Sequence, residues 1–495
     1  MVDLSNPLPA AKKRTFTPEM EAIFAHEPVA PLIVEAGAGS GKTSTLVEYA
    51  KRWKRLKGLY LAYNAAIAKE AKSRFPGHIH ASTAHSYAFR ALGVGRHSAR
   101  LVGKLRKNDL FEAGIRFDDA PLADDKMYRA ISKGVENFCN SAGSELTASH
   151  CGLDAYGRPT QDRVMQMIAP VIDRIIRFDE SGLPFTHDVY LKNLEMHGKL
   201  GSDYDYIMVD EAQDLNPLLL SLVGRSGKPC IYVGDRKQSI YAFRGSIDAL
   251  SQIDAKSLPL SQSWRFGQSV ADVSNFLLEH TSFPPTWKLK GKPGHTTTIS
   301  EYKGQAPAYS MVLSRTNSRL FEGLVNVKVP FHVIGGFEAI AIQLLSALAL
   351  SRGAPRSQIK DPVVQGYRQW SDMVSDAKHG DDPEVRRIVK IIEDYGERIT
   401  SIIDDLRKIH CPDMGSAKLV LSTAHKSKGL EAPTVVILDD FQTINDLREL
   451  KAARKLRQVD FDQEIHLKYV AGSRATDLLL LSGPLWSEIQ HLVNP

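Results

Sequence analysis

Cysteine is scarce in this sequence, with four residues among 495 (Cys139, Cys151, Cys230 and Cys411). They are scattered and form no C-x-x-C pair, so the pattern argues against a disulfide framework and favours reduced thiols in a cytosolic compartment. His150 and Cys151 lie near Cys139, but their spacing matches no standard zinc pattern. We therefore expect no metal site of the zinc type in this part of the chain.

Long apolar runs are also missing. No stretch approaches the ~20 apolar residues that a membrane helix needs. The opening residues MVDLSNPLPAAKKR contain prolines and basic groups, and no apolar segment follows them as in a signal peptide. We therefore expect no membrane association and a cytoplasmic location, either at the nucleoid or in a phage-infected bacterial cell.

A strong excess of one charge is absent, since the formal net charge is +6. This mild basic balance permits nucleic acid as a partner without requiring it. The hydrophobic share of 43% and the charged share of 24% are ordinary for a globular protein. A chain of 495 residues exceeds what one core usually serves, so several domains are expected.

Short apolar runs that alternate with helical stretches predict an α/β fold with parallel sheets covered on both faces. The strand candidates are PLIVEAG, GLYLAYN, YDYIMVD and PCIYVGD, followed after SLPLSQSWRFG by YSMVLSRTN, FHVIGG, AKLVLSTAH, TVVILDD and DLLLLSG. We predict a first α/β domain from residues 1–90 and 200–258, with a helical insertion at 91–199. A second α/β domain is predicted from 259–336 and 416–495, with a shorter helical insertion at 337–415.

The stretch AGAGSGKT, which directly follows the first strand candidate, has the form of a phosphate-binding loop. Glycines let backbone N–H groups surround phosphate oxygens, and the start of the next helix adds a positive dipole. Lys42 would pair with the β- and γ-phosphates, and Thr43 would offer its hydroxyl to Mg²⁺. The predicted ATP-binding residues of this segment are Ala36, Gly37, Ala38, Gly39, Ser40, Gly41, Lys42, Thr43 and Ser44.

A second apolar strand, IMVDEAQD, delivers Asp210 and Glu211 to the edge of the sheet where ligands bind in open α/β folds. Asp210 would hold Mg²⁺, and Glu211 would orient and polarise the attacking water. Hydrolysis also needs positive charge at the γ-phosphate. Arg265 in LSQSWRFG and Arg474 in KYVAGSRATD are candidates for this role.

Six motifs in order resemble those of the UvrD/Rep/PcrA group of superfamily 1A DNA helicases: AGAGSGKT, VDEAQD, GDRKQSIYAFRG, LSQSWRFG, STAHKSKGLE and YVAGSRAT. The stretches YLAYNAAIAKEAKSRFP and THDVYLKNL are most similar to the F-box DNA helicase branch. The resemblance implies two RecA-like motor domains, ATP and Mg²⁺ as cofactors, and ATP bound in the cleft between the two domains.

The resemblance also implies roles for residues outside the phosphate loop. Gln238 matches the γ-phosphate sensor, Trp264 the aromatic residue that stacks near adenine, and Glu431 the residue that binds ribose. Arg265 and Arg474 match two arginine fingers. The predicted DNA contacts are Tyr63, Asn64, Thr83, His85, Ser86, Phe243, Arg244, Thr423 and His425.

These roles explain why the loop GDRKQSIYAFRG combines an amide, aromatic rings and a cation. Gln238 would face the nucleotide, while Phe243 and Arg244 would face DNA. Stacking of a base on an aromatic side chain contributes roughly 1–3 kcal/mol and works with every base, so a motor can release and remake it. For Tyr241, packing in the core is favoured over contact with a ligand.

The sequence departs from the family pattern in several places. Met20 stands where the family has an adenine-reading Gln, and a thioether cannot form the paired hydrogen bonds of an amide, which opens the question of NTP selectivity. Ala65 follows Asn64 where a Lys is usual, and Tyr63 takes the place of an aromatic at Ala62. Gly472-Ser473 replaces the usual pair before the last Arg, and the second insertion is short.

Three functions fit these motifs. The first is an ATP-driven helicase that moves 3′ to 5′ on single-stranded DNA, a polarity implied by the resemblance alone. The second is a translocase that strips recombinase filaments with little unwinding, and the third is a nucleotide-gated DNA-binding protein. We expect single-stranded DNA and single-strand/duplex junctions as partners, recombination or replication proteins as open candidates, and a monomer without DNA.

Overall fold

The computed structural model describes residues 16–240, 249–379 and 382–493. The chain divides into two compact units. Among the described residues, the first unit comprises 16–36, 41–236 and 249–260. The second comprises 37–40, 237–240, 261–379 and 382–493. Each unit is built around its own sheet, and each is described by itself.

The sheet of the first unit has six parallel strands in the order β3-β2-β4-β5-β1-β6. Because all strands run in one direction, their carboxyl ends share one edge, where ligands bind in open α/β sheets. The strands are β1 (Leu32–Ala36), β2 (Gly58–Leu61), β3 (Ile79–Ser82), β4 (Tyr206–Val209), β5 (Cys230–Gly234) and β6 (Lys256–Leu260).

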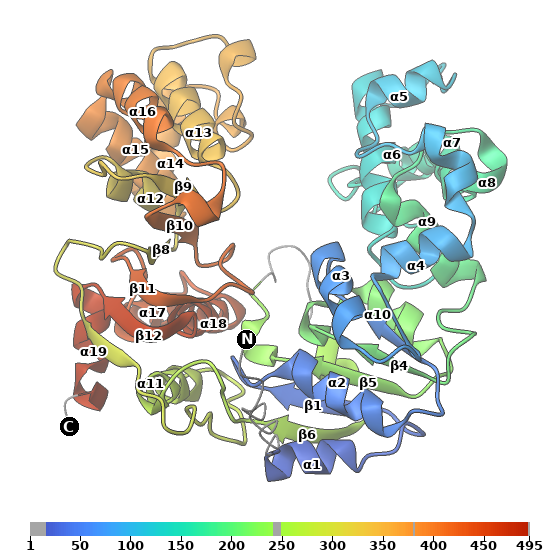
Figure 1. Ribbon diagram of the computed structural model, residues 1–495. Helices are drawn as coiled ribbons and strands as arrows, with labels where there is room; N and C mark the ends of the chain where they lie inside the picture. Colours follow the sequence, from blue (N-terminus) through green and yellow to red (C-terminus); the bar gives the residue numbers. More distant parts are fainter. Residues whose placement is uncertain (1–15, 241–248, 380–381, 494–495) are drawn as a thin grey trace, which may run out of the picture. The chain divides into compact units, whose positions relative to one another are not determined.

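Helices cover both faces of this sheet (Figure 1). Alternate side chains along each strand pack on opposite faces, so Val34 and Tyr60 share one core cluster while Ile33 and Leu59 belong to the other. The first cluster includes residues of α1 (Pro18–Phe24), α2 (Lys42–Arg52) and α3 (Ala65–Arg74), and the second includes residues of α4 (Ala84–Ala91) and α10 (Pro217–Gly224).

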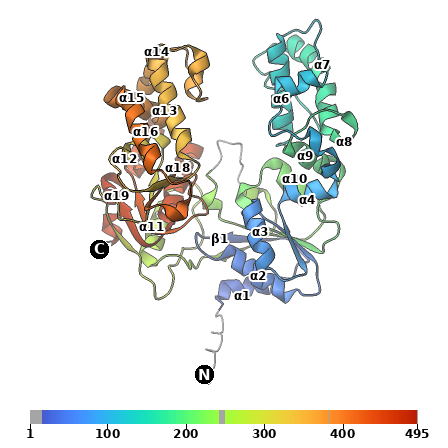
Figure 2. The same ribbon diagram turned by 45° about the horizontal axis from the view of Figure 1, so that its top comes forward.

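The long connection between α4 and β4 forms a helical group that continues the second of these clusters. Its helices are α5 (Lys107–Glu112), α6 (Asp124–Phe138), α7 (Arg158–Ile176), α8 (Phe178–Ser181) and α9 (His187–His197). Helices α6 to α9 lie together in both views (Figures 1 and 2). Apolar residues such as Ile131, Ile168 and Leu191 are almost fully buried among them, which explains why these amphipathic segments pack as a group.

The sheet of the second unit also has six parallel strands, in the order β7-β12-β11-β8-β10-β9. They are β7 (Thr298–Glu301), β8 (Ser310–Ser314), β9 (Phe331–Val333), β10 (Leu419–Thr423), β11 (Ala432–Ile437) and β12 (Ala475–Leu481). One core cluster joins this sheet to α11 (Gln268–Glu279), α17 (Ile444–Ala452), α18 (Gln458–Gly472) and α19 (Gly483–Val493).

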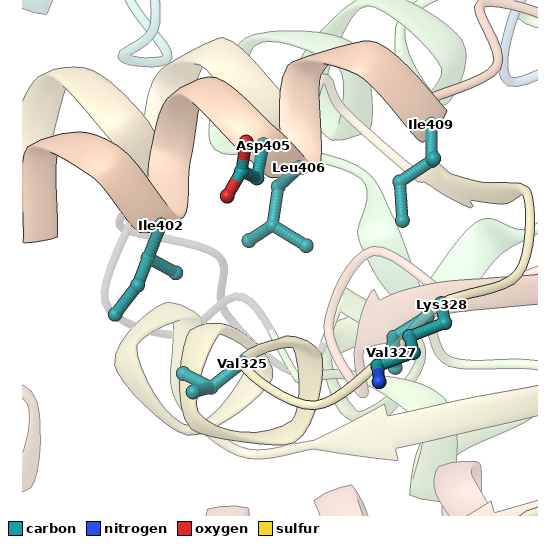
Figure 3. Close-up of a pocket in the computed structure, with 7 residues that line it drawn as sticks. All are labelled: Val325, Val327, Lys328, Ile402, Asp405, Leu406 and Ile409. Carbon is teal, nitrogen blue, oxygen red and sulfur yellow. The ribbon is translucent and has the colours of Figure 1, made fainter.

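The opposite face of the second sheet packs against α12 (Asn317–Leu324) and against a helical group inserted between β9 and β10. The members of that group are α13 (Phe337–Ser351), α14 (Trp370–His379), α15 (Pro383–Tyr395) and α16 (Arg398–Ile409). A groove of about 280 Å³ lies between α16 and the segment that follows α12, with Ile402 and Leu406 on one side and Val325 on the other (Figure 3). Its lining contains no residue predicted to contact nucleotide or DNA.

The predicted fold class is confirmed, and the strand candidates correspond to β1, β2, β4, β5 and β8 to β12. Strands β3, β6 and β7, which are all edge strands, were not predicted from the sequence. Edge strands are short and partly exposed, so they lack the apolar run that marks an inner strand. In β6 the pattern is further obscured by Pro259, a residue that a sheet tolerates at its edge.

Candidate nucleotide site and DNA-facing segments

The loop between β1 and α2 has the backbone that its glycines predict. Gly39 and Gly41 have φ angles of 69° and 80°, a region that side chains with a Cβ atom rarely adopt. Gly41 is the N-cap of α2, so Lys42 and Thr43 occupy the first helical turn. The N-terminus of α2 therefore presents its free N–H groups at the carboxyl edge of the first sheet.

The two predicted motifs of the first unit meet at this edge. The Lys42 Nζ atom lies 2.8 Å from the Glu211 Oε1 atom. The Thr43 hydroxyl donates to the Asp210 Oδ2 atom over 3.1 Å. The structure thus brings together the four side chains that the sequence analysis assigned to phosphate, Mg²⁺ and water, while their roles stay predictions.

A carboxylate beside a hydroxyl at a helix start is the kind of donor set that Mg²⁺ prefers, because this ion binds hard oxygen ligands. Asp210 and Thr43 supply those two groups. The hydroxyl oxygen of Ser40, in the same loop, is buried without a hydrogen-bond partner among the described residues. These residues fit a bound Mg²⁺–nucleotide, in which Asp210 and Thr43 would hold the metal.

The charged groups at this edge shift one another's pKa. Burial opposes the charge of Lys42, but Glu211 and Asp210 outweigh burial and raise the pKa of Lys42 above its ordinary value. Burial and the nearby charge of Glu211 raise the pKa of Asp210, although Lys42 and the Tyr60 hydroxyl act in the opposite direction. An ATP phosphate would bring further negative charge to Lys42, which is suited to accept it.

Two neighbours that the sequence analysis did not assign hold the acids in place. The Tyr60 hydroxyl donates to the Asp210 Oδ2 atom over 2.6 Å. The Gln213 Nε2 atom donates to the Glu211 Oε2 atom over 2.6 Å, and its Oε1 atom accepts from the Asp235 N–H over 3.1 Å. Gln213 stands inside the VDEAQD motif, so the sequence offered a signal that it belongs to the site. Tyr60 offered none, because in sequence it is one more member of an apolar strand.

Glu211 itself has a left-handed backbone, with φ at 52°. Such a conformation costs a non-glycine residue of order 1–3 kcal/mol and is kept only where the surroundings enforce it. Its N–H donates to the Asp210 Oδ1 atom over 3.0 Å, and its carboxylate is held by Lys42 and Gln213. This backbone turns two successive carboxylates toward the same phosphate loop.

In the second unit, residues 37–40 pack beside the segment after β6. The backbone N–H of Trp264 donates to the Gly39 carbonyl over 2.8 Å. A Cβ atom at Gly39 would come within 2.7 Å of the Arg265 Cβ atom, so glycine is required there for space as well as for φ. Arg265 pairs with Glu431 over 2.7 Å and donates to the Ser473 carbonyl, so the predicted finger and the predicted ribose ligand contact each other.

Arg474 is the largest side chain that is almost fully buried in the described part of the chain. Its guanidinium donates to the carbonyl oxygens of Val470 and Leu430 over 2.8 and 3.1 Å. It also contacts the Gln238 Oε1 atom over 3.4 Å. The structure therefore joins the predicted γ-phosphate sensor to the second predicted finger inside the second unit.

Several predicted DNA contacts begin helices in the first unit. The Asn64 side chain accepts from the Ile67 N–H at the start of α3, and the Thr83 hydroxyl oxygen accepts from the Ser86 N–H at the start of α4. Side-chain caps of this kind explain why the sequence places polar residues there. Tyr63, just before the cap of α3, is 53% exposed.

A cavity of about 570 Å³ lies between α3, α4 and α9 in the first unit. Its lining includes Thr83, His85 and Ser86 from the predicted set, and also Lys69, Lys72, Phe89, Arg90, His187 and Tyr190. The His85 Nε2 atom lies 3.0 Å from the Asp188 Oδ1 atom, which fixes the ring orientation. Cations and aromatic rings thus surround three of the predicted contacts.

The remaining predicted residues that the structure describes do not line this cavity. Thr423 ends β10 and is 6% exposed, and His425 follows it in the second unit. Phe243, Arg244 and Tyr241 lie outside the described residues. Met20 is 7% exposed and belongs to the core cluster of α1, so its packing accounts for an apolar residue at this position.

Comparison with known proteins identifies the first part of the chain. Residues 16–256 match the UvrD/REP helicase N-terminal domain. This part of the chain thus resembles the UvrD/REP helicases. The match to this UvrD/REP domain includes the phosphate loop, both acids and the helical group between α4 and β4.

The UvrD/REP resemblance extends further in individual relatives. F-box DNA helicase 1 of Gallus gallus is 28% identical over 511 residues, which cover 96% of this chain and 49% of that protein. F-box DNA helicase protein 1 of Schizosaccharomyces pombe is 28% identical over 491 residues, which cover 91% and 55%. DNA helicase II of Escherichia coli is 26% identical over 373 residues, which cover 64% and 51%.

The chain therefore spans about half the length of the curated relatives that it matches. A solved complex of Arterivirus nonstructural protein 10 (helicase) with DNA covers 96% of this chain and 65% of that chain, at 12% identity and a TM-score of 0.33. The predicted resemblance to UvrD/Rep/PcrA helicases and to the F-box branch is confirmed. No described helix has both the length and the apolar character needed to span a bilayer.

Proposed function

We propose that this chain is an ATP-dependent DNA helicase that moves along single-stranded DNA and separates duplex strands. The observation that carries the proposal is the cluster of Lys42, Thr43, Asp210 and Glu211 at the carboxyl edge of the first sheet. The match of residues 16–256 to the UvrD/REP helicase N-terminal domain and the names of the helicase relatives support the same function.

The proposed hydrolysis assigns one task to each side chain. Mg²⁺ neutralises phosphate charge when it is bound, and Asp210 and Thr43 would hold it. Lys42 binds the phosphates, and Glu211 orients water and accepts its proton. Since Lys42 contacts Glu211 in this structure, nucleotide binding is expected to exchange that ion pair for a Lys42–phosphate contact and free the carboxylate.

Contact with DNA is proposed for the cavity beside α3 and α4. Lys69, Lys72 and Arg90 supply positive charge, and phosphate binding by such groups releases counterions. Phe89 and Tyr190 supply flat apolar surface for bases or sugars. Because every nucleotide carries both a phosphate and a ring, this combination suits DNA of any sequence.

The finer assignments follow from the family resemblance and from the predicted roles. We propose 3′-to-5′ movement, contact of Gln238, Arg265 and Arg474 with the γ-phosphate, and stacking of DNA bases on Phe243. Single-stranded DNA and single-strand/duplex junctions are the proposed partners. The domain boundaries, the location in the cell and the pathway stay predictions, with repair, replication, recombination and phage replication all open.

The test is strand separation at low salt with ATP and Mg²⁺, on duplexes that carry either a 3′ or a 5′ single-stranded tail. ATP hydrolysis with and without single-stranded DNA is measured in the same reactions, with Lys42→Ala as the inactive control. Unwinding of the 3′-tailed duplex alone supports the helicase and its polarity.

Other outcomes of this test separate the alternatives. Hydrolysis stimulated by DNA without unwinding of either duplex would favour a translocase that removes proteins from DNA. Binding of DNA that depends on ATP, with hydrolysis too slow to support movement, would favour a nucleotide-gated DNA-binding protein. Absence of both DNA binding and hydrolysis from the folded wild-type chain would refute the proposal.

A further inference from the structure

Tyr60 is a core residue with a polar contact that its packing does not require. It lies on the inner strand β2, is 0% exposed, and its ring packs on Phe75 with a centroid distance of 4.6 Å. Its hydroxyl donates to the Asp210 Oδ2 atom over 2.6 Å, across 150 residues of sequence. A phenylalanine would fill the same space, so the hydroxyl calls for a separate reason.

Two other tyrosines in the same core cluster show the contrast. Tyr49 and Tyr206 are also 0% exposed and belong to the same cluster as Tyr60. Their hydroxyl oxygens have no hydrogen-bond partner among the described residues. Burial of a tyrosine at this face of the sheet is therefore compatible with an unbonded hydroxyl, and the Tyr60 contact depends on the position of Asp210.

The Asp210 carboxylate is fixed at both oxygens. Its Oδ2 atom accepts from Tyr60 and from Thr43, over 2.6 and 3.1 Å, and its Oδ1 atom accepts from the Glu211 N–H over 3.0 Å. Hydrogen bonds to an ionised carboxylate are short and directional. Without the Tyr60 hydroxyl, Oδ2 would keep only the weaker of its two donors and the carboxylate could turn about its terminal bond.

We propose that Tyr60 is a positioning residue that holds the Asp210 carboxylate beside the Thr43 hydroxyl, so that both can bind Mg²⁺ together with ATP. The proposal rests on the proposed function, because it assigns a metal-bound nucleotide to these two side chains. Tyr60 touches neither the nucleotide nor the reacting atoms and acts through Asp210. Its loss should therefore weaken Mg²⁺-dependent binding more than nucleotide binding as such.

The experiment measures binding of a fluorescent ATP analogue to the full chain, across a series of Mg²⁺ concentrations and also in EDTA. In Tyr60→Phe, the Mg²⁺ concentration for half-maximal binding should rise about 10–100-fold, as expected for loss of one hydrogen bond to a charged group. Affinity in EDTA should equal that of the wild type. Tyr49→Phe is the matched control, because it removes a buried hydroxyl without a partner from the same cluster.

A second experiment, in the Asp210→Asn variant, tests whether Tyr60 acts through the Asp210 carboxylate. In Asp210→Asn, the further change Tyr60→Phe should leave the Mg²⁺ dependence unaltered, because the carboxylate that Tyr60 orients is gone. An unchanged Mg²⁺ dependence in Tyr60→Phe alone would overturn the proposal, and so would an equal loss of affinity with Mg²⁺ and in EDTA. If the folded wild-type chain shows no Mg²⁺-dependent ATP binding, the proposed function itself fails, which is a separate result.

Discussion

Replacement of Gln213 by Leu tests how the water-orienting acid is held. The Gln213 side chain is fully buried and joins the ends of two strands. Its amide donates to Glu211 after β4 and accepts from the Asp235 N–H after β5, at 2.6 and 3.1 Å. These two bonds also fix the orientation of the amide, since only its nitrogen can donate to a carboxylate.

The magnitude follows from these two contacts. A hydrogen bond to a charged group contributes about 1.5–3 kcal/mol, and an N–H left buried without a partner costs about 1–3 kcal/mol. Gln213→Leu should therefore lower the free energy of unfolding by about 3–5 kcal/mol. It should also lower the rate constant of ATP hydrolysis by about 10–100-fold, because Glu211 loses its orientation relative to the attacking water.

Urea unfolding and single-turnover ATP hydrolysis measure the two effects. Gln343→Leu is the control, because Gln343 is also buried but its Oε1 atom has no partner among the described residues. Gln213→Glu keeps the side-chain length but sets a second carboxylate against Glu211. This variant should hydrolyse ATP at least as slowly as Gln213→Leu. Hydrolysis by Gln213→Leu at the wild-type rate would refute the positioning role.

Four further outcomes are expected. Lys42→Ala should abolish ATP hydrolysis. Glu211→Gln should still bind ATP in filter-binding assays but release phosphate about 100-fold more slowly. Normal turnover in either variant would contradict the assignment of the hydrolysis site. The double variant Lys69→Ala, Lys72→Ala should bind single-stranded DNA with a weaker salt dependence. In fluorescence titrations, the slope of log affinity against log salt should fall by about 1.4, which is about 0.7 for each lost phosphate contact. An unchanged slope would show that the cavity does not bind DNA phosphates. Burial raises the pKa of Glu384 from 4.5 to about 7, so the folded state loses stability as pH rises between these values. Glu384→Gln should therefore raise the free energy of unfolding by about 3 kcal/mol at about pH 8 and leave it unchanged near pH 4, and equal effects at both pH values would contradict this sign.

The sequence alone determined the parts of this protein whose chemistry is local. A strand, a glycine-rich turn and a helix start are consecutive in AGAGSGKT, so the phosphate loop could be identified without tertiary information. Inner strands carry continuous apolar runs because both faces are covered, and each of them was predicted. The order of six motifs also sufficed to predict the resemblance to UvrD/REP helicases that the comparison found for residues 16–256.

Three edge strands and the partners of polar side chains were decided by the tertiary structure. β3, β6 and β7 lack an apolar run because one side of each is open, so their pairing with an inner strand defines them. The partner of a polar side chain is likewise undetermined by its neighbours in sequence. Tyr60 is indistinguishable from a packing residue until β2 is placed beside β4, which sets its hydroxyl against Asp210.

The same reason separates the identity of the site residues from their arrangement. Thr43 and Asp210 are 167 positions apart, and no local pattern records that their oxygens lie within hydrogen-bond distance. Arg265 and Glu431 were assigned to different parts of the nucleotide, yet the fold pairs them directly. Residue type and local spacing determined which chemistry is present, whereas parallel strand order and side-chain packing decided which of these groups contact one another.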